Sequence, residues 1–277
     1  MIKLCDLKRQ PLAISAAIEG VFFSGQFVKG PKVEEFETVW AKKCGMKYAI
    51  GVSSGADALE LAIERVEGLG GEVTIPSWTF KAVHNAVLRC GYTPKYNDKH
   101  PQIYAHHLHE TKLDYIPLLE DCSHVHGYKP IAETAIFSLF PTKILGACGD
   151  AGVIVTNSRE DYEWYLDKRS HGEGGTNARM DEVQAAILLV KLGFLDEWIS
   201  KRKSIVEKYD KAFGRITPGE FHYAYTIPGS VEKKKKLISL GIESAFYYNE
   251  NYMALPLHPG LSDREIKQVI KAVQKIT

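Results

Sequence analysis

Short apolar segments alternate with helix-like patterns through the first two thirds of the chain. Tyr48–Val52 and Glu72–Pro76 have the length and composition of buried strands, and helical apolar spacing follows them at Ala56–Val66 and Phe80–Leu88. Four more strands are predicted at Ile103–Leu108, Tyr115–Leu119, Ala135–Phe140 and Val153–Thr156. Strands that are apolar throughout and separated by helices indicate a mostly parallel sheet with both faces covered. The pattern therefore predicts an α/β fold.

The pattern changes after Met180. Apolar residues there recur at helical spacing, and a more polar helix is predicted to continue through Tyr209. Beyond Pro218 the chain has the pattern of a small α+β module that ends in a helix over Asp263–Ile276. We therefore predict two domains, a large one over residues 1–200 and a small C-terminal one over 201–277.

Composition and charge exclude several classes of protein. The 277 residues carry 35 Lys and Arg against 34 Asp and Glu, a net charge of +1, so no global field attracts nucleic acid or a membrane surface. No apolar run approaches the ~20 residues that span a bilayer, and the N-terminus has no apolar signal core, so we expect a cytoplasmic protein. Five cysteines without a CxxC pair argue against a disulfide scaffold or a zinc knuckle.

Polar residues at three predicted strand ends are candidates for chemistry, because ligands of open α/β sheets bind at the carboxyl ends of strands. The first is the turn Gly51-Val52-Ser53-Ser54-Gly55-Ala56-Asp57, which leads directly into a helix. Free N–H groups and the positive end of the dipole at a helix start suit a phosphate. The alternative is an ordinary helix cap by Ser53 or Ser54. Because the chain has no GxGxxG, this turn is not a dinucleotide fingerprint.

The other two strand ends offer an acid and an amine. Asp121 follows a buried apolar run, where a carboxylate is costly to ionise unless a cation faces it, although a helix-capping role is the alternative. Lys143 follows another predicted strand among apolar and glycine residues, where a lysine can act as a nucleophile. Its alternative is a surface lysine whose stem covers apolar neighbours.

Together these groups match what pyridoxal 5'-phosphate requires. That cofactor needs a lysine for a Schiff base, an acid beside its ring nitrogen and a cradle for its phosphate. An aromatic ring usually lies against its face, and Phe80, shortly after a predicted strand, is placed to provide one. A core position for Phe80 is the alternative.

In these segments the chain resembles the DegT/DnrJ/StrS family of sugar-nucleotide aminotransferases. The matching segments are Ser24–Pro31 with Phe36-Glu37, Ser54–Leu59, Pro76–Phe80, Glu120–His124, Phe137–Lys143, Gly175–Ala186 and Leu255–Ser262. The resemblance implies a PLP-dependent transferase of fold type I, the aspartate-aminotransferase-like architecture, with a small C-terminal α+β domain.

The resemblance also implies roles for individual residues. Lys143 and Asp121 would be catalytic, the lysine forming the Schiff base and the aspartate pairing with the ring nitrogen. His124 would contact the ring hydroxyl, and Phe80 would stack on the ring. The remaining cofactor-binding residues would hold the phosphate: Gly55, Ala56, Asp57, Ser138 and Asn177, the last from the neighbouring subunit of a homodimer. The physical spacing agrees, since Ser138 and Lys143 lie one turn apart.

The implied reaction moves an amino group, with glutamate as the expected donor, to a keto-sugar nucleotide through pyridoxamine phosphate, and so makes an amino sugar. The chain departs from the family between Tyr96 and Tyr115 and after Ile216, where it is shortened. Individual replacements are Ala56, Ile144, Ala151 and the pair Tyr247-Tyr248. Because the shortened regions include the one that contacts sugar nucleotides, two alternatives stay open: a cofactor-binding regulatory or inactive relative, and an aminotransferase for a non-nucleotide keto compound.

Histidines and lysines suggest two further sites, and we predict neither. His106, His107, His109, His124 and His126 lie close in sequence. Because neighbouring strand residues point to opposite faces, His106 and His107 do not converge on one metal, so no metal site is predicted. Lys233–Lys236 fit a solvated helix face better than a nucleic-acid patch.

Overall fold

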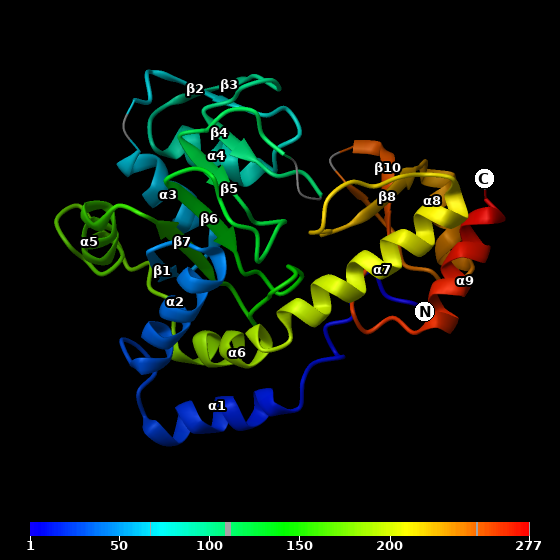
Figure 1. Ribbon diagram of the computed structural model, residues 1–277, viewed down its shortest axis with the longest axis horizontal. Coiled ribbons are helices and arrows are strands. Elements are labelled where there is room, and N and C mark those ends of the chain that lie inside the picture. Colours follow the sequence, from blue (N-terminus) through cyan, green and yellow to red (C-terminus); the bar gives the residue numbers. More distant parts are fainter. Residues whose placement is uncertain (67, 109–111, 248, 277) are drawn as a thin grey trace. The chain divides into compact units, whose positions relative to one another are not determined.

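The computed structural model describes residues 1–66, 68–108, 112–247 and 249–276. The chain forms two compact units (Figure 1). The large unit comprises Pro11–His107 and Lys112–Leu195, and the small unit comprises Met1–Gln10, Leu108–Thr111 and Asp196–Thr277. The assignment of 1–200 and 201–277 as functional domains stays a prediction.

A five-stranded sheet forms the centre of the large unit. Its strands, in spatial order, are β1 (Tyr48–Val52), β7 (Gly152–Thr156), β6 (Thr134–Ser138), β5 (Leu119–Asp121) and β4 (Ile103–Ala105). β7 is antiparallel to both of its neighbours, whereas β6, β5 and β4 are parallel to one another. The sheet is therefore mostly parallel, as predicted.

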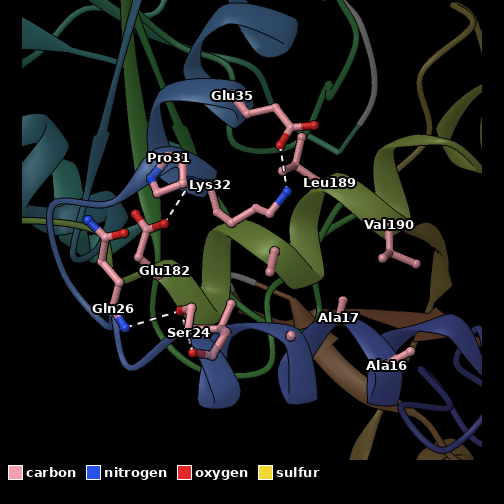
Figure 2. Close-up of a pocket in the computed structure, with 13 residues that line it drawn as sticks. Ala16, Ala17, Ser24, Gln26, Pro31, Lys32, Glu35, Glu182, Leu189 and Val190 are labelled. Atoms are coloured by element: carbon pink, nitrogen blue, oxygen red, sulfur yellow. Dashed lines mark hydrogen bonds and ion pairs between the residues drawn. The ribbon is translucent and has the colours of Figure 1, made fainter.

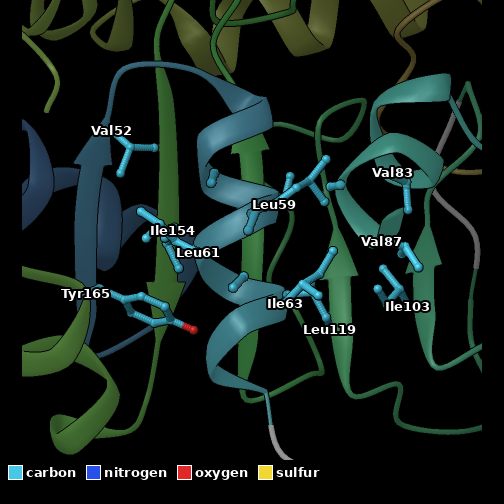
Figure 3. Packing of buried hydrophobic residues seen from close by; sticks show 14 of the residues in the cluster. Val52, Leu59, Leu61, Ile63, Val83, Val87, Ile103, Leu119, Ile154 and Tyr165 are labelled. Carbon is cyan, nitrogen blue, oxygen red and sulfur yellow. The ribbon is translucent and has the colours of Figure 1, made fainter. Parts of the chain in front are cut away.

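Helices cover both faces of this sheet. On one face, α3 (Gly55–Arg65) packs Leu59 and Ile63 against strand residues such as Leu119, and α4 (Lys81–Arg89) extends the same cluster (Figure 3). On the other face, Trp40 of α2 (Pro31–Cys44) makes an edge-to-face contact with Phe137, with ring centroids 5.1 Å apart. Both Trp40 and Phe137 are fully buried. Alternation along β6 thus sends neighbouring residues into two separate layers.

Two predicted strands differ from the observed ones. The strand expected over Ile103–Leu108 ends at Ala105. The one expected over Tyr115–Leu119 begins at Leu119 instead, where pairing with β4 starts. Ile116 is 72% exposed, so the apolar residues before Leu119 do not lie in the sheet. As a result Glu120 and Asp121 belong to the strand itself and do not follow it.

A further strand pair adjoins the sheet. β2 (Glu72–Ile75) was predicted, whereas its parallel partner β3 (Thr93–Tyr96) was not. β3 has the sequence Thr-Pro-Lys-Tyr and is largely exposed, so it lacks the apolar pattern by which buried strands are detected. The other helices of the large unit are α1 (Ala13–Ser24), α5 (Arg159–Lys168) and α6 (Glu182–Leu192).

The small unit is an α+β module, as predicted. Its antiparallel sheet has the order β8 (Tyr225–Pro228), β10 (Asn249–Leu255), β9 (Ala245–Tyr247). The helices are α7 (Leu195–Phe213), α8 (Val231–Ser239) and α9 (Asp263–Gln274). Ser262 and Glu265 form a capping box that fixes the start of α9. Tyr248, singled out in the sequence, lies outside the described residues.

Candidate active site

The serine-rich turn after β1 begins α3, and its polar groups are held in place. Ser54 is the N-cap, with its Oγ 3.1 Å from the Asp57 N–H that donates to it. The Asp57 carboxylate accepts hydrogen bonds from both serine hydroxyls, that of Ser54 over 2.8 Å. The capping alternative is therefore correct, and it is compatible with an anion site. The Asp57 N–H is engaged by the cap, so the first-turn donors that this cap leaves unused are those of Gly55 and Ala56.

The end of β6 lies directly against this helix start. A Cβ added to Gly55 would be 2.6 Å from the Ser138 Cβ and 3.0 Å from the Ser138 Oγ. The backbone of Gly55 therefore packs directly against Ser138 because Gly55 has no side chain. The Ser138 N–H donates to Ser123 Oγ over 2.9 Å, and Ser123 follows β5. The carboxyl ends of three strands, β1, β5 and β6, thus meet around Ser138.

Asp121 and His124 occupy the end of β5 and the turn after it. Each is 8% exposed. The Asp121 Oδ1 accepts a hydrogen bond from the Ser123 N–H over 2.9 Å, which directs the carboxylate toward the strand end. His124 Nδ1 is hydrogen bonded to the backbone carbonyl of His107. Because a carbonyl only accepts, Nδ1 carries the proton and Nε2 is left with a lone pair.

The protonation of His124 depends on its burial and on the charge of Lys143. Burial lowers the pKa of His124 well below its usual value, and the positive charge of Lys143 lowers it further. His124 is therefore neutral at physiological pH. The structure brings the candidate amine and this imidazole within electrostatic range of each other, as a common site requires.

Lys143 itself sits on a tight loop after β6. Its N–H donates to the Phe140 carbonyl over 2.9 Å, and the side chain is half-buried. Gly146 closes the loop, because a Cβ there would lie 2.5 Å from the Pro141 carbonyl oxygen. Ile144, the residue after the lysine, is buried. The backbone of the lysine is thus held by a packed loop, and its half-buried side chain is compatible with both the nucleophile and the alternative of a lysine whose stem covers apolar neighbours.

The structure places Phe80 and Asn177 at the surface of the large unit. Phe80 is 65% exposed, so the alternative that it is a core aromatic is wrong. Its segment is anchored by Trp78, whose Nε1 donates to the Ala105 carbonyl over 3.2 Å. Asn177 is exposed, and the carbonyl of the next residue, Ala178, accepts from the Ser53 N–H over 2.9 Å. The segment that carries Asn177 therefore lies beside the serine-rich turn of its own chain.

A buried acid and base lie on the other side of β5, and the sequence did not reveal them as a pair. His106 Nε2 is 2.7 Å from Glu120 Oε1, and both side chains are fully buried. Glu120 Oε2 also accepts from the N–H groups of Ile131 and Ala132 over 2.9 and 3.2 Å. The alternation of side chains along strands could have indicated this pair. Tyr104 pairs with Glu120, and His106, two residues after Tyr104, lies on the same face of the sheet.

Cys122 joins this pair, and the three ligand atoms lie within 4.8 Å of one another, as a metal site would require. However, two ligands of one tetrahedral zinc are ~3.3 Å apart at the usual bond lengths. The 2.7 Å between His106 and Glu120 is instead a hydrogen-bond distance. The arrangement is that of a hydrogen-bonded pair. His109, considered with the other histidines, lies outside the described residues.

A cavity of about 330 Å³ lies elsewhere in the large unit, among α1, α2 and α6 (Figure 2). Its wall includes Glu182, whose carboxylate accepts N–H groups of Gly30 and Lys32, and the ion pair of Lys32 with Glu35 at 2.8 Å. None of the predicted site residues is among its lining in the part of the chain described. We therefore place the candidate site at the strand ends and not in this cavity.

Lys233–Lys236 lie on α8, as predicted. Lys236 pairs with Glu232 at 2.9 Å, and Lys234 Nζ lies 4.8 Å from the ring centroid of Phe246. These contacts are those of a solvated helix face. Across the described residues, no helix is both long and apolar enough to cross a membrane.

Comparison with known proteins identifies relatives for most of the chain. A transaminase from Streptomyces venezuelae, dTDP-3-amino-3,4,6-trideoxy-alpha-D-glucose transaminase, is 32% identical over 240 residues, which cover 70% of this chain and 63% of that protein. UDP-2-acetamido-2-deoxy-3-oxo-D-glucuronate aminotransferase from Pseudomonas aeruginosa is 28% identical, and the alignment covers 99% of both chains. This chain therefore spans less than two thirds of the first relative and nearly all of the second.

Solved structures agree on the fold. The crystal structure of Streptomyces venezuelae DesV in complex with a ketimine intermediate superimposes with a TM-score of 0.87 at 27% identity, over 99% of this chain and 98% of that one. The predicted aminotransferase fold of type I is thus confirmed. The profile of the DegT/DnrJ/EryC1/StrS aminotransferase family matches residues 12–113 and 106–224. The chain belongs to the DegT/DnrJ/EryC1/StrS aminotransferase family.

Proposed function

We propose that this chain is a pyridoxal-phosphate-dependent aminotransferase that moves an amino group, from glutamate, to a keto-sugar nucleotide. The observation that carries the proposal is the meeting of three strand ends, with Gly55 against Ser138 and Lys143 within electrostatic range of His124. The relatives named above, which are sugar-nucleotide transaminases by name, support the substrate class.

The residues present fit the cofactor. The close contact of Gly55 and Ser138 leaves the N–H groups at the start of α3 beside a serine hydroxyl, which is the donor set that a phosphate needs. Asp121 is a buried carboxylate suited to a protonated ring nitrogen, and the exposed Phe80 has a ring face available for stacking. When bound, the cofactor supplies an aldehyde that exchanges amines and a ring that accepts an electron pair.

The chain's own residues would do the rest. Lys143 would hold the cofactor through its aldehyde, and the lysine's amine would move a proton from and to the donor's α-carbon. Asp121 would keep the ring nitrogen protonated. His124, held neutral by burial and by the charge of Lys143, would accept a hydrogen bond at Nε2 and so orient the ring hydroxyl. The Ser138 hydroxyl and the N–H groups of Gly55 and Ala56 would hold the phosphate, whereas Asp57, whose N–H donates to Ser54, would fix the turn that presents them.

The proposal includes a homodimer in the cytoplasm. Asn177 is exposed and lies next to a residue bonded to the serine-rich turn, so its amide is available to a phosphate held by a second copy or by its own chain. The family resemblance favours the second copy. Sedimentation of the purified protein, with and without the cofactor, tests this part.

The proposed function is tested by following its two half-reactions separately, first with the amino donor and then with the keto-sugar acceptor. Purified protein is titrated with pyridoxal phosphate and then mixed with glutamate, and the absorption spectrum is followed. We expect a violet-light band that borohydride bleaches, loss of the band with glutamate, and its return with an accepted keto-sugar nucleotide, together with a mass change of the sugar. The Lys143→Arg variant should bind the cofactor but should not show the violet-light band, because it lacks the amine that forms the Schiff base.

Two outcomes contradict the proposal. A protein that stays colourless with added cofactor has no such site. A protein that forms the band but leaves it unchanged with every amino donor is the regulatory or inactive relative, and turnover of simple keto acids or cyclitols without nucleotide sugars would indicate a different acceptor.

A further inference from the structure

Two charged side chains from distant parts of the large unit meet at Gly51, the fourth residue of β1. The Gly51 N–H donates to Glu37 Oε1 over 2.7 Å, and Arg169 Nη1 donates to the Gly51 carbonyl over 2.6 Å. Arg169 Nη1 also donates to the same Glu37 oxygen. Glu37 comes from α2, and Arg169 follows α5. Both backbone groups of one residue are therefore bound by one ion pair.

The place of Gly51 in the sheet explains this arrangement. β1 is the edge strand, and Gly51 faces Val153 of β7 across the ladder. In an antiparallel pair the N–H and C=O of one residue point the same way, and here they point outward, to where a further strand would lie. The carboxylate and the guanidinium make the two hydrogen bonds that a neighbouring strand would have made, and so they close the edge.

The pair is mostly buried. The side chains of Glu37 and Arg169 are 10% and 14% exposed. Burial raises the pKa of Glu37, and the charge of Arg169 acts in the opposite direction, as does the hydrogen bond from Gly51. Partly buried charges of this kind are costly unless they are paired, so each partner depends on the other.

The consequence reaches the candidate phosphate cradle. Gly51 is three residues before the helix cap Ser54, so the direction in which β1 leaves the sheet sets the start of α3. Beyond Gly51 the same edge continues, with Ser53 N–H bonded to the Ala178 carbonyl. The Ala178 N–H in turn donates to the carbonyl of Arg169 over 3.0 Å. One ion pair thus fixes both the turn that begins α3 and the segment that carries Asn177.

We propose that Glu37 and Arg169 are positioning residues for the cofactor's phosphate group. They hold β1 and the segment 169–179 in register, so that the N–H groups of Gly55 and Ala56 converge on one anion. This inference rests on the proposed function, but it makes a prediction of its own. The pair should affect binding of the phosphate group and leave binding of the cofactor's ring unchanged.

The test compares pyridoxal phosphate with pyridoxal, which lacks the phosphate but keeps the aldehyde and the ring. Apoprotein is titrated with each ligand, and affinity for inorganic phosphate is measured by competition. For Glu37→Gln we expect about a tenfold or larger rise in the dissociation constant for pyridoxal phosphate, since charge-assisted hydrogen bonds are lost, with the constant for pyridoxal unchanged. Arg169→Lys, which keeps the charge, should restore part of the affinity lost in Arg169→Gln.

The matched control is Arg159→Gln, which removes the exposed ion pair of Arg159 with Glu163, whose side chains are 79% and 60% exposed. It should leave both dissociation constants unchanged. If Glu37→Gln does not fold, the double variant Glu37→Gln/Arg169→Gln avoids an unpaired buried charge and is measured instead.

The outcomes separate the two proposals. A wild-type protein that binds neither ligand overturns the proposed function and this inference with it. If the wild-type protein binds pyridoxal phosphate and the variants prefer pyridoxal phosphate to pyridoxal as strongly as the wild type does, the inference is overturned. The proposed function then remains intact. Equal loss of both ligands also overturns it, because the pair would then act only on the fold.

Discussion

A Cβ atom at Gly55 would lie 2.6 Å from the Cβ of Ser138, closer than packed carbon atoms approach. The start of α3 and the end of β6 are therefore in contact only because residue 55 has no side chain. Glycine is needed here for close approach, because its φ is not in the left-handed region, unlike that of Gly45 or Gly68.

Gly55→Ala should accordingly separate the two groups that are proposed to hold the phosphate. We expect a loss of about 1–3 kcal/mol in the free energy of unfolding from overpacking, and a weaker affinity for pyridoxal phosphate. Gly20→Ala is the control, because nothing lies within 4 Å of its added Cβ and it is in the interior of α1. That change should be neutral or stabilise by about 0.5–1 kcal/mol. Equal behaviour of the two variants in urea unfolding would contradict the packing argument.

Phe80→Ala should weaken cofactor binding without a cost in stability. A ring that is 65% exposed contributes little to the core, so we expect the free energy of unfolding of the apoprotein to change by less than about 0.5 kcal/mol. The affinity for pyridoxal phosphate should fall because the stacking surface is lost. Ile116→Ala, at a residue 72% exposed, controls for loss of an exposed apolar side chain and should leave affinity unchanged. A destabilised Phe80→Ala apoprotein with normal affinity would show that the ring serves the fold.

His106→Leu should be strongly destabilising, because it leaves the buried Glu120 carboxylate without its histidine partner. Breaking a buried pair by removing one partner typically costs about 3–5 kcal/mol. His100, paired with Asp114 at 3.5 Å on the surface, provides the control, and His100→Leu should change stability by less than about 1 kcal/mol. Urea unfolding of both variants measures the difference. If His106→Leu is as stable as wild type, Glu120 does not depend on His106 in the folded state.

The sequence was most informative where residues are buried in regular strands. The predicted bounds of β1 agree with the observed ones, and β7 differs by one residue. It was less informative for short edge elements such as β3, whose exposed residues carry no apolar signal. The serine-rich turn, Asp121 and Lys143 were found because each lies at or shortly after a predicted strand end. Their grouping at one end of the sheet follows from the parallel order of β4, β5 and β6.

The pairs that support the site could not be predicted in this way. Glu37 and Arg169 are 132 positions apart, and neither lies at a strand end. Glu37 occurs in a matching segment of the family, but its local sequence indicates only a helix. Its partner is fixed by the tertiary structure, where α2 and the segment after α5 both reach the open edge of β1. Such pairs satisfy backbone groups that hydrophobic periodicity does not describe.

His258 should make the small unit sensitive to acid. It is 4% exposed, and burial lowers its pKa to about 4, with the charges of Arg202 and Arg9 acting in the same direction. Its pKa in the unfolded chain is about 6.5, so between these values the unfolded state binds more protons than the folded state. The stabilisation is therefore fully present above pH ~6.5 and is lost as the pH falls toward 4, by an amount on the order of 3 kcal/mol. Urea unfolding at several pH values, followed by circular dichroism, measures this slope.

His258→Asn removes the titrating group and should flatten the dependence of the free energy of unfolding on pH between 4 and 6.5, whatever its effect on stability at pH 7. His100→Asn, at an exposed position, should keep the wild-type slope. Asp6 and Glu265 act in the opposite direction on His258, so Asp6→Asn should lower the histidine's pKa further and extend the loss of stability to lower pH. A His258→Asn variant with the wild-type slope would mean that other groups produce the acid sensitivity.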